Sequence, residues 1–365
     1  MATNIGAADG PVDDLVSPRE LTGRRLMLAS IVALVVACII SMGTGSTGVQ
    51  LTALPGAIAS SLGYSAEPAD VRASLVLIDL RLPRTLLAIF VGGSLAVAGA
   101  MMQGLFRNPL ADPGLVGVSS GATLAAVTFI VLGNTYLGGW QALMGIYALP
   151  VAAFGGGLVA TVVLMGVASR HGGTAVATLL LAGIALGALT GALTGILAYV
   201  SNDRELRDLT LWSMGSFSGS SWSKAAAIAP FAFILLVALP GLVRALNGML
   251  LGEAEAYHLG IDLESAKRKV VLLTAMAVGG SVAVAGIIGF VGIVIPHCVR
   301  MIAGPDHRIV LPASTLLGAA LVLGADVISR VIVAPAELPI GIIMAIIGAP
   351  VFLHLVLKRS SAVAF

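Results

Sequence analysis

The stretch that decides the fold is residues 81–122, which read RLPRTLLAIFVGGSLAVAGAMMQGLFRNPLADPGLVGVSSGA. No charged residue lies between Arg84 and Arg107, and the apolar run near 84–106 exceeds the roughly 20 residues that a helix needs to cross a membrane. Two prolines four residues apart, Pro109 and Pro113, then forbid a continuous helix and predict a tight turn. A second apolar run, near 114–133, follows at once. This pattern is typical of a membrane protein.

The whole chain has the same character. Of its 365 residues, 58% are hydrophobic and only 10% are charged, and the mean hydropathy is +1.03. Soluble domains carry about 25% charged residues, so this chain has too little polar surface to face water all round. The 45 glycines fit close packing of helices in lipid. The net charge of +2 gives no indication of nucleic-acid binding.

We therefore predict an all-α integral membrane protein with about ten transmembrane helices. The first apolar run follows Arg24 and Arg25 as in a signal peptide, but it continues past the usual length with no cleavage site, so we interpret it as a membrane span. Residues 1–25 are predicted to be a cytoplasmic tail and 26–359 the membrane domain. Region 270–304 fits two short spans, or one span with a re-entrant turn. The predicted spans lie near 26–46, 84–106, 114–133, 145–169, 174–199, 224–246, 270–286, 289–304, 311–330 and 339–357.

The distribution of basic residues predicts which ends face the cytoplasm. An even number of spans puts both termini on one side. With the N-terminus inside, the cytoplasmic segments hold 13 of the 20 lysines and arginines, and the outer segments hold 7. Trp140, Trp212 and Trp222 would then all lie at the outer interface, where indole rings are favoured. Both cues predict that the two termini are cytoplasmic.

The RLPR motif places arginines where local physics disfavours them. Pro83 suits the first position of a helix, because its missing N–H would be unsatisfied there anyway. Arg81 and Arg84 would then place positive charge at a helix N-terminus, which the helix dipole disfavours. They would also lie on the outer side, whereas basic residues are usually enriched on the cytoplasmic side. They either meet carboxylates of a partner protein on the outer side or bind lipid headgroups.

Two further outer segments carry charge. Asp326 and Arg330 are four residues apart, so they lie on one helix face and can pair. An ionisable residue inside a span is a functional candidate, yet this pairing is an equally good structural explanation. Asp203 fits the N-cap of a short helix over the outer mouth, and a solvated loop is the alternative.

The connection 252–269 is the longest polar stretch between inner ends of spans. Glu253 begins good helix-forming sequence with acidic residues in its first turn, and Gly260 suits a left-handed stop. Residues 262–269 form another turn or continue into the next helix. A cytoplasmic partner could grip such an element, and a plain linker is the alternative. No GxxxxGK[ST] phosphate loop is present, so another chain must supply any nucleotide site.

Single residues with metal-binding chemistry have ordinary explanations. His297 lies in an apolar stretch with no second candidate ligand at helical spacing, so we interpret it as a packing histidine. Cys38 and Cys298 are far apart in apolar stretches, with no metal-ligand spacing between them. We predict that this chain binds no metal or cofactor of its own.

Taken in order, these motifs resemble the FecCD-type permeases, the membrane subunits of bacterial ABC importers for iron-siderophores, haem and cobalamin. The resemblance runs from about residue 70 to 359. The matching pieces are the opening stretch 81–122, LRDLTLWSMGSFSGSSW (206–222), GEAEAYHLGID (252–262), GFVGIVIPHCVRMIAGPDHR (289–308) and AELPIGIIMAIIGAPVFLHLV (336–356).

The resemblance implies a type II importer of the cytoplasmic (inner) membrane. Its ten-helix permease is a homodimer with the pathway between the subunits, and it performs no chemistry. Two ATPase subunits, which hold ATP and Mg, dock inside, and a periplasmic substrate-binding protein docks outside. Arg81, Arg84 and Arg330 would contact glutamates of that binding protein. Segment 252–267 would couple to the ATPase, through Glu253, Glu255, Ala256, Leu259, Gly260 and Asp262.

The substrate is predicted less directly. Segment 201–222 resembles the haem importers through its LTxWxxGS pattern, and cobalamin permeases share part of it, so haem is expected, with a ferric siderophore or cobalamin as the alternative. The histidines fall towards the inner side of the predicted topology, so iron ligation would rest with the binding protein. They are His171, His258, His297, His307 and His354.

Two other functional classes have less support. An ion-coupled secondary transporter needs carboxylates near the middle of the bilayer, and Asp326 is the only candidate in the sequence. An intramembrane enzyme needs a converging nucleophile or metal set, and the sequence offers none.

Overall fold

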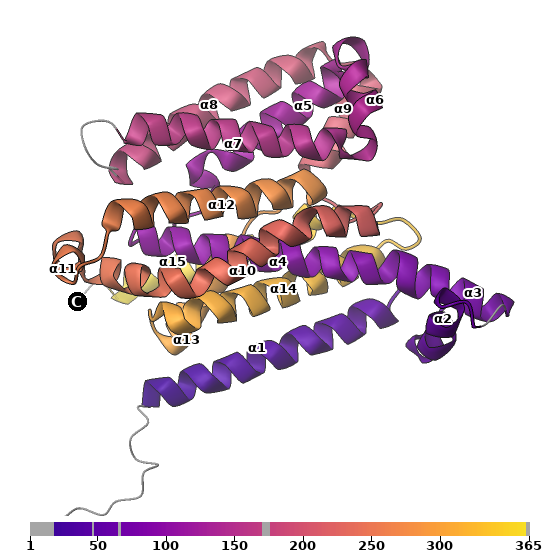
Figure 1. Ribbon diagram of the computed structural model, residues 1–365, viewed down its shortest axis with the longest axis horizontal. Helices are drawn as coiled ribbons and strands as arrows, with labels where there is room; N and C mark the ends of the chain where they lie inside the picture. Colours follow the sequence, from indigo (N-terminus) through magenta and orange to yellow (C-terminus); the bar gives the residue numbers. More distant parts are fainter. Residues whose placement is uncertain (1–17, 46, 65–66, 170–175, 363–365) are drawn as a thin grey trace, which may run out of the picture.

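The computed structural model describes residues 18–45, 47–64, 67–169 and 176–362. Helices and their connections account for all of these residues, with no strand among them, which confirms the all-α prediction (Figure 1). The long helices are α1 (Pro18–Gly43), α4 (Leu82–Leu105), α5 (Val118–Tyr136), α7 (Ala148–Ala168), α8 (Val176–Val200), α10 (Trp222–Leu251), α12 (Leu263–Ala285), α13 (Val291–Ala303), α14 (His307–Val331) and α15 (Ile340–Ala362). The short ones are α2 (Leu54–Ser61), α3 (Pro68–Ser74), α6 (Gly138–Met144), α9 (Asp203–Ser213) and α11 (Glu253–His258).

Each of the ten predicted spans coincides with one of the long helices. Three of these, α5, α13 and α15, are shorter apolar helices. Seven helical stretches within the described residues are long and apolar enough to cross a membrane: Arg19–Gly43, Pro68–Leu105, Gly138–Ala168, Val176–Val200, Trp222–Leu251, Leu263–Ala285 and His307–Val331.

The first helix begins earlier than predicted. Of the predicted tail 1–25, residues 1–17 lie outside the described part of the chain, and the remainder belongs to α1, which begins at Pro18. Proline is favoured in the first turn of a helix, and Arg24 donates to Glu20 one turn earlier at 3.1 Å. These local interactions extend the helix beyond its apolar part.

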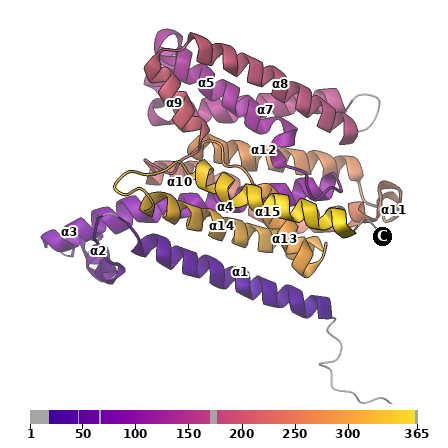
Figure 2. The ribbon, with the colours of Figure 1, turned by 180° about the vertical axis from the view of Figure 1, so that it is seen from behind.

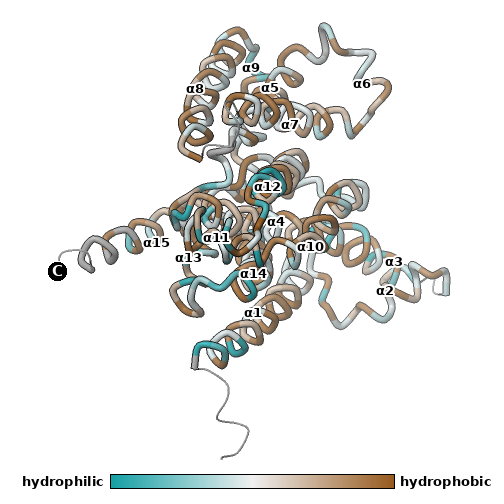
Figure 3. Tube along the Cα trace, turned by 60° about the vertical axis from the view of Figure 1, so that its left-hand side comes forward, coloured by the Kyte–Doolittle hydropathy of each residue, from teal (hydrophilic) through white to brown (hydrophobic). Residues whose placement is uncertain are grey.

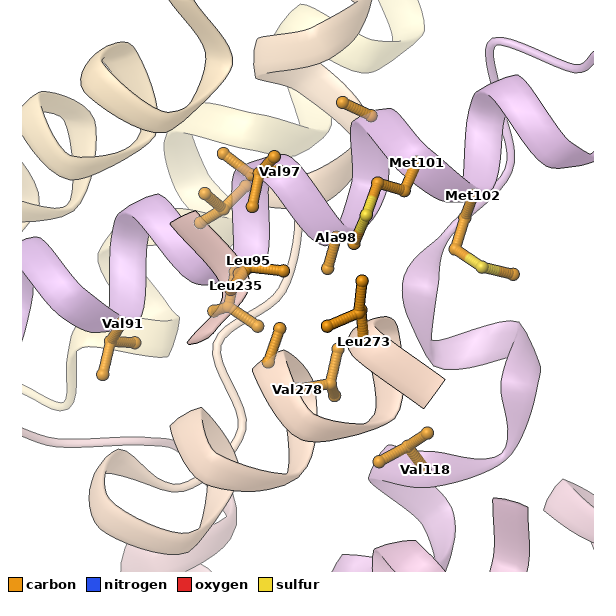
Figure 4. Packing of buried hydrophobic residues seen from close by; sticks show 14 of the residues in the cluster. Val91, Leu95, Val97, Ala98, Met101, Met102, Val118, Leu235, Leu273 and Val278 are labelled. Atoms are coloured by element: carbon orange, nitrogen blue, oxygen red, sulfur yellow. The ribbon is translucent and has the colours of Figure 1, made fainter. Parts of the chain in front are cut away.

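Helix α4 lies at the centre of the molecule and packs against α10, α12, α13 and α14. In the most apolar 18-residue window of the Pro68–Leu105 stretch, 83% of the residues are buried. In the corresponding window of Arg19–Gly43, only 11% are buried. Figure 4 shows Leu95 and Ala98 of α4 facing Leu235 of α10 and Leu273 of α12. A second group, α5, α7 and α8, is joined to the first through α12 (Figures 1 and 2).

The ends of the bundle differ in the elements that they carry. Short helices α2, α3, α6 and α9 lie at one end (Figure 1), and α11 lies at the other. Helix α1 begins, and α15 ends, at the α11 end. The view from nearer that end shows hydrophilic segments at the starts of α1 and α12 (Figure 3). The α11 end is therefore the cytoplasmic side of the predicted topology, and the α9 end is the outer side.

The RLPR motif stands at the start of α4 with Pro83 in its first turn, as predicted, but this start is not a free helix end. Helix α3, a π-helical stretch at Leu75–Arg81 and α4 run on continuously from Pro68. The N–H of Leu82 donates to the carbonyl of Leu77, five residues back, and this wider turn directly precedes Pro83. A π-helical turn relieves the clash of the proline ring with the carbonyl four residues earlier. The arginines therefore face no free helix N-terminus, and the argument from the helix dipole fails.

Region 270–304 consists of one full span, α12, and a half-length helix, α13. At 1.5 Å per residue the 13 residues of α13 reach about 20 Å, less than the ~30 Å hydrocarbon core. Helix α13 begins against the middle of α4, where a Cβ on Gly99 would overlap the carbonyl oxygen of Gly292. Gln103 donates to that same carbonyl at 3.2 Å. Pro296 has no N–H to donate to it, so Gln103 replaces the lost helix bond.

Candidate docking and coupling sites

The outer arginine cluster consists of Arg81, Arg84 and Arg330 with Asp326 and Glu337. Asp326, fully buried on α14, receives Arg84 Nη2 at 2.8 Å and Arg330 Nε at 3.1 Å. Arg84 Nη1 also reaches Glu337 Oε1 at 2.8 Å. The predicted pair of Asp326 and Arg330 is therefore present. The longer pairings were not predicted, because positions 242 and 253 residues apart carry no local signal.

Two of these arginines also hold the outer end of α1. Arg81 donates to the carbonyl of Met42 at 2.6 Å and to Thr47 Oγ1 at 3.0 Å. Arg330 donates to the carbonyl of Thr44 at 2.9 Å and contacts Ser41 Oγ at 3.2 Å. The last carbonyls of a helix lack partners within it, and both guanidinium groups supply donors to them. The cluster therefore joins α1, α4 and α14 at the outer end.

The cluster retains one net positive charge and borders a cavity. Its three arginines face two carboxylates. A cavity of about 260 Å³ is lined by all three arginines, Glu337 and residues 217–220. Although Arg81 is only 6% exposed and Arg330 8%, each reaches this cavity. An outside carboxylate could approach them there, so contact with a binding protein stays a prediction.

The short helix α9 packs against α5 at the same outer end of the bundle (Figure 1). Of the two alternatives for this segment, a short helix and a solvated loop, the structure has the helix, and its N-cap is Asn202 and not Asp203. Asn202 accepts from the Glu205 N–H at 3.0 Å, and Glu205 accepts from the Asn202 N–H at 3.0 Å. This reciprocal capping box satisfies two N–H groups, which a cap one residue later would not do with these side chains.

At the inner end, the coupling segment 252–267 has the predicted helix and stop. Helix α11 begins at Glu253, and Gly260 has the left-handed φ of 71° that ends a helix. Asp262 then caps α12 by accepting from the Ser265 N–H at 3.0 Å, so the sequence continues directly into the next helix. Lys267 reaches Glu253 Oε2 at 3.0 Å and fixes α11 to α12.

The coupling segment has a buried side and an exposed side. Ala256 is fully buried, and Ile261 packs so closely on Gly248 of α10 that a Cβ there would overlap it. Tyr257 is 74% exposed and Leu259 52%. Glu253, Glu255, Gly260 and Asp262 are exposed too. The segment is thus fixed to α10 on one side and presents apolar and acidic groups to the cytoplasmic side.

A partly buried polar network lies behind this segment. The Nδ1 of His307 lies 2.8 Å from Asn247 Oδ1, and the Asn247 amide donates to Asp306 at 2.7 Å. Because Oδ1 can only accept, His307 carries its proton on Nδ1, and Nε2 accepts from Arg300 at 3.3 Å. Arg300 also donates to Gln103 and to the Ala100 carbonyl. The inner end of α10 is therefore linked to α4, α13 and α14. This network was not predicted.

Comparison with known proteins places the chain among transport proteins. A family model described as the FecCD transport family matches residues 33–358. The hemin transport system permease protein HmuU of Yersinia pestis is 46% identical over 284 residues, which cover 77% of this chain and 83% of that protein. The cobalamin import system permease protein BtuC of Halobacterium salinarum is 38% identical over 353 residues, which cover 95% of this chain and 92% of that protein.

Two further comparisons agree with these. The vitamin B12 import system permease protein BtuC of Salmonella typhi is 43% identical over 297 residues, covering 80% of this chain and 86% of that protein. A solved structure, described as an inward-facing conformation of an ABC transporter assigned to the metal-chelate type, is 31% identical. It has a TM-score of 0.79 and covers 92% of this chain and 99% of its own.

Proposed function

Because the chain belongs to the FecCD transport family, it is the permease subunit of an ABC importer of the metal-chelate type, and we propose that its substrate is haem. It is a multi-pass protein of the cytoplasmic membrane and a transport subunit, not an enzyme. The observation that supports haem is the 46% identity to the hemin permease, against 38–43% for the cobalamin permeases quoted above. Cobalamin is the second candidate, because those permeases align over as much as 95% of the chain. A ferric siderophore is the third.

Two partners and a second copy complete the proposed importer. Two copies of the chain form the pathway between them, and an ATPase subunit docks on each coupling segment. The exposed Tyr257 and Leu259 suit such an interface, since aromatic and apolar side chains provide most binding energy. A binding protein docks at the outer arginine cluster, where its glutamate would displace Glu337 from Arg84. Glu337 is the accessible member of that pair, with a side chain 34% exposed against 13%.

Motion of the coupling segment would reach the pathway by two contacts. Ile261, which follows α11, packs on Gly248 near the inner end of α10. A shift of α11 would therefore move that end of α10 as well. Asn247 then transmits the movement through His307 and Arg300 to the middle of the bundle. Two discrete arrangements of these contacts would correspond to the outward- and inward-open states.

Haem would pass without ligation of its iron at the outer end. Among the described residues the histidines lie in α11, in the inner half-helix α13, at the start of α14 and near the end of α15. The remaining one, His171, lies outside the described residues. A pathway without an outer axial histidine would bind haem weakly enough to release it, which conduction requires.

Competition for uptake tests the substrate. Proteoliposomes carrying this chain with its cognate ATPase and binding protein should accumulate haem when ATP is enclosed, and a tenfold excess of a ferric siderophore or of cobalamin should leave the rate unchanged. Accumulation of cobalamin in place of haem would move the assignment to the second candidate. Protein-free liposomes with the same lipids correct for haem that partitions into the bilayer.

A further inference from the structure

A separate cavity of about 670 Å³ opens at the outer end, between the starts of α7, α10 and α15 and the ends of α9 and α12. Most of its lining is apolar, and Trp212 is one of the residues that line it. Four hydroxyl or charged side chains stand out from that lining: Ser216, Ser218, Lys224 and Glu337. Glu337 lies between this cavity and the cavity of the outer arginine cluster, because it lines both.

The charges that line this cavity do not cancel within the chain. The carboxylate of Glu337 is held by Arg84 at 2.8 Å, so its charge is already compensated. Lys224 is half-buried, and no carboxylate among the described residues lies within 4.0 Å of its ammonium group. It also stands in the first turn of α10, where the helix dipole disfavours a cation. A half-buried, unpaired ammonium group costs free energy that an anionic ligand would recover.

We propose that Lys224 binds a carboxylate of the transported molecule as it enters this outer cavity, and that the apolar wall with Trp212 accepts its flat aromatic part. The ligand class is an amphipathic aromatic dicarboxylate, of which a porphyrin with two propionate groups is the simplest case. The inference rests on the proposed function in one respect, since it takes the cavity as the entrance for the substrate. A neutral substrate would gain nothing from Lys224.

A lysine that merely extends into solvent is the competing explanation. It predicts no preference for an anionic ligand and no effect on a ligand that contacts Trp212. The position of the side chain favours a binding role. The ammonium group lies 3.9 Å from the place a Cβ on Gly219 would occupy, so it turns back over the 217–220 loop that separates the two outer cavities.

The test measures binding without ATP, the ATPase or the binding protein, so its result is independent of the uptake experiments. The chain in lipid discs, with Trp140→Phe and Trp222→Phe so that Trp212 alone fluoresces, is titrated with mesoporphyrin and with its dimethyl ester. The dicarboxylate should quench Trp212 with an affinity about tenfold higher than the diester, the factor expected of one charge-assisted hydrogen bond. Empty discs correct for partition into lipid.

The matched variants decide the role of the lysine. Lys224→Gln should remove the preference for the dicarboxylate, Lys224→Arg should keep it, and Lys269→Gln, an exposed lysine at the inner end, should leave it unchanged. Equal binding of the two porphyrins by the unsubstituted chain would overturn the proposal without any variant. A preference that survives Lys224→Gln would overturn it too.

Discussion

Replacing Asp326 with asparagine is expected to destabilise the protein by about 3–5 kcal/mol, the range measured when one partner of a buried ion pair is removed. Asp326 is fully buried and compensates both Arg84 and Arg330, so its loss leaves Arg84 with Glu337 as its remaining carboxylate and leaves the buried Arg330 with none in contact. Repulsion between the two guanidinium groups should loosen the outer end of α1, α4 and α14. Thermal unfolding of the purified protein in detergent measures the effect.

An exposed ion pair provides the control. Glu20→Gln removes the partner of Arg24 on a surface where the two side chains are 53% and 68% exposed, and surface pairs are worth less than about 1 kcal/mol. A melting temperature for Asp326→Asn no lower than that of Glu20→Gln would show that the outer arginine cluster does not hold these helices together.

Replacing Tyr257 and Leu259 together with aspartate is expected to lower ATP-driven uptake at least tenfold while the chain still folds. Both side chains are exposed on the coupling segment, so charge is tolerated there. Within the proposed ATPase interface, two new carboxylates would remove apolar contacts that are each worth more than about 1 kcal/mol. The measurement is haem uptake together with the amount of ATPase subunit that co-purifies with the chain.

The matched control lies at the opposite end of the bundle. Leu206 of α9 is 43% exposed, and Leu206→Asp should leave the amount of co-purified ATPase unchanged. Full uptake and normal co-purification for the Tyr257 and Leu259 variant would exclude the coupling segment as the contact with the ATPase.

Local sequence signals predicted the features of the fold that depend on neighbouring residues. The apolar runs determined the helices, because their length alone decides whether a segment can cross a bilayer. The ion pair of Asp326 and Arg330 and the stop at Gly260 are both set within one helical turn. Such interactions need no knowledge of the tertiary arrangement.

The features that sequence reasoning missed depend on distant contacts. Arg84 finds Asp326 only after α4 and α14 have packed together, and the hydrogen bond from Gln103 to the Gly292 carbonyl likewise forms only when α4 and α13 meet. The π-helical turn before Pro83 depends on a continuous helix that an isolated proline does not predict. Arg81 and Arg84 were expected to meet either carboxylates of a partner protein or lipid headgroups, yet each already has acceptors within the chain.

The central claim is that this chain is the permease subunit of an ATP-driven importer. The most direct test is to measure on which side of the membrane ATP must be supplied for haem to be taken up. Proteoliposomes with the binding protein outside should accumulate haem when ATP is enclosed. The binding protein can reach only the molecules whose outer end faces outward, and in these molecules the α11 end, with the ATPase, faces the lumen. ATP added only outside should give no accumulation. Haem accumulation that an ion gradient drives without ATP would contradict the account and identify the chain as a secondary transporter.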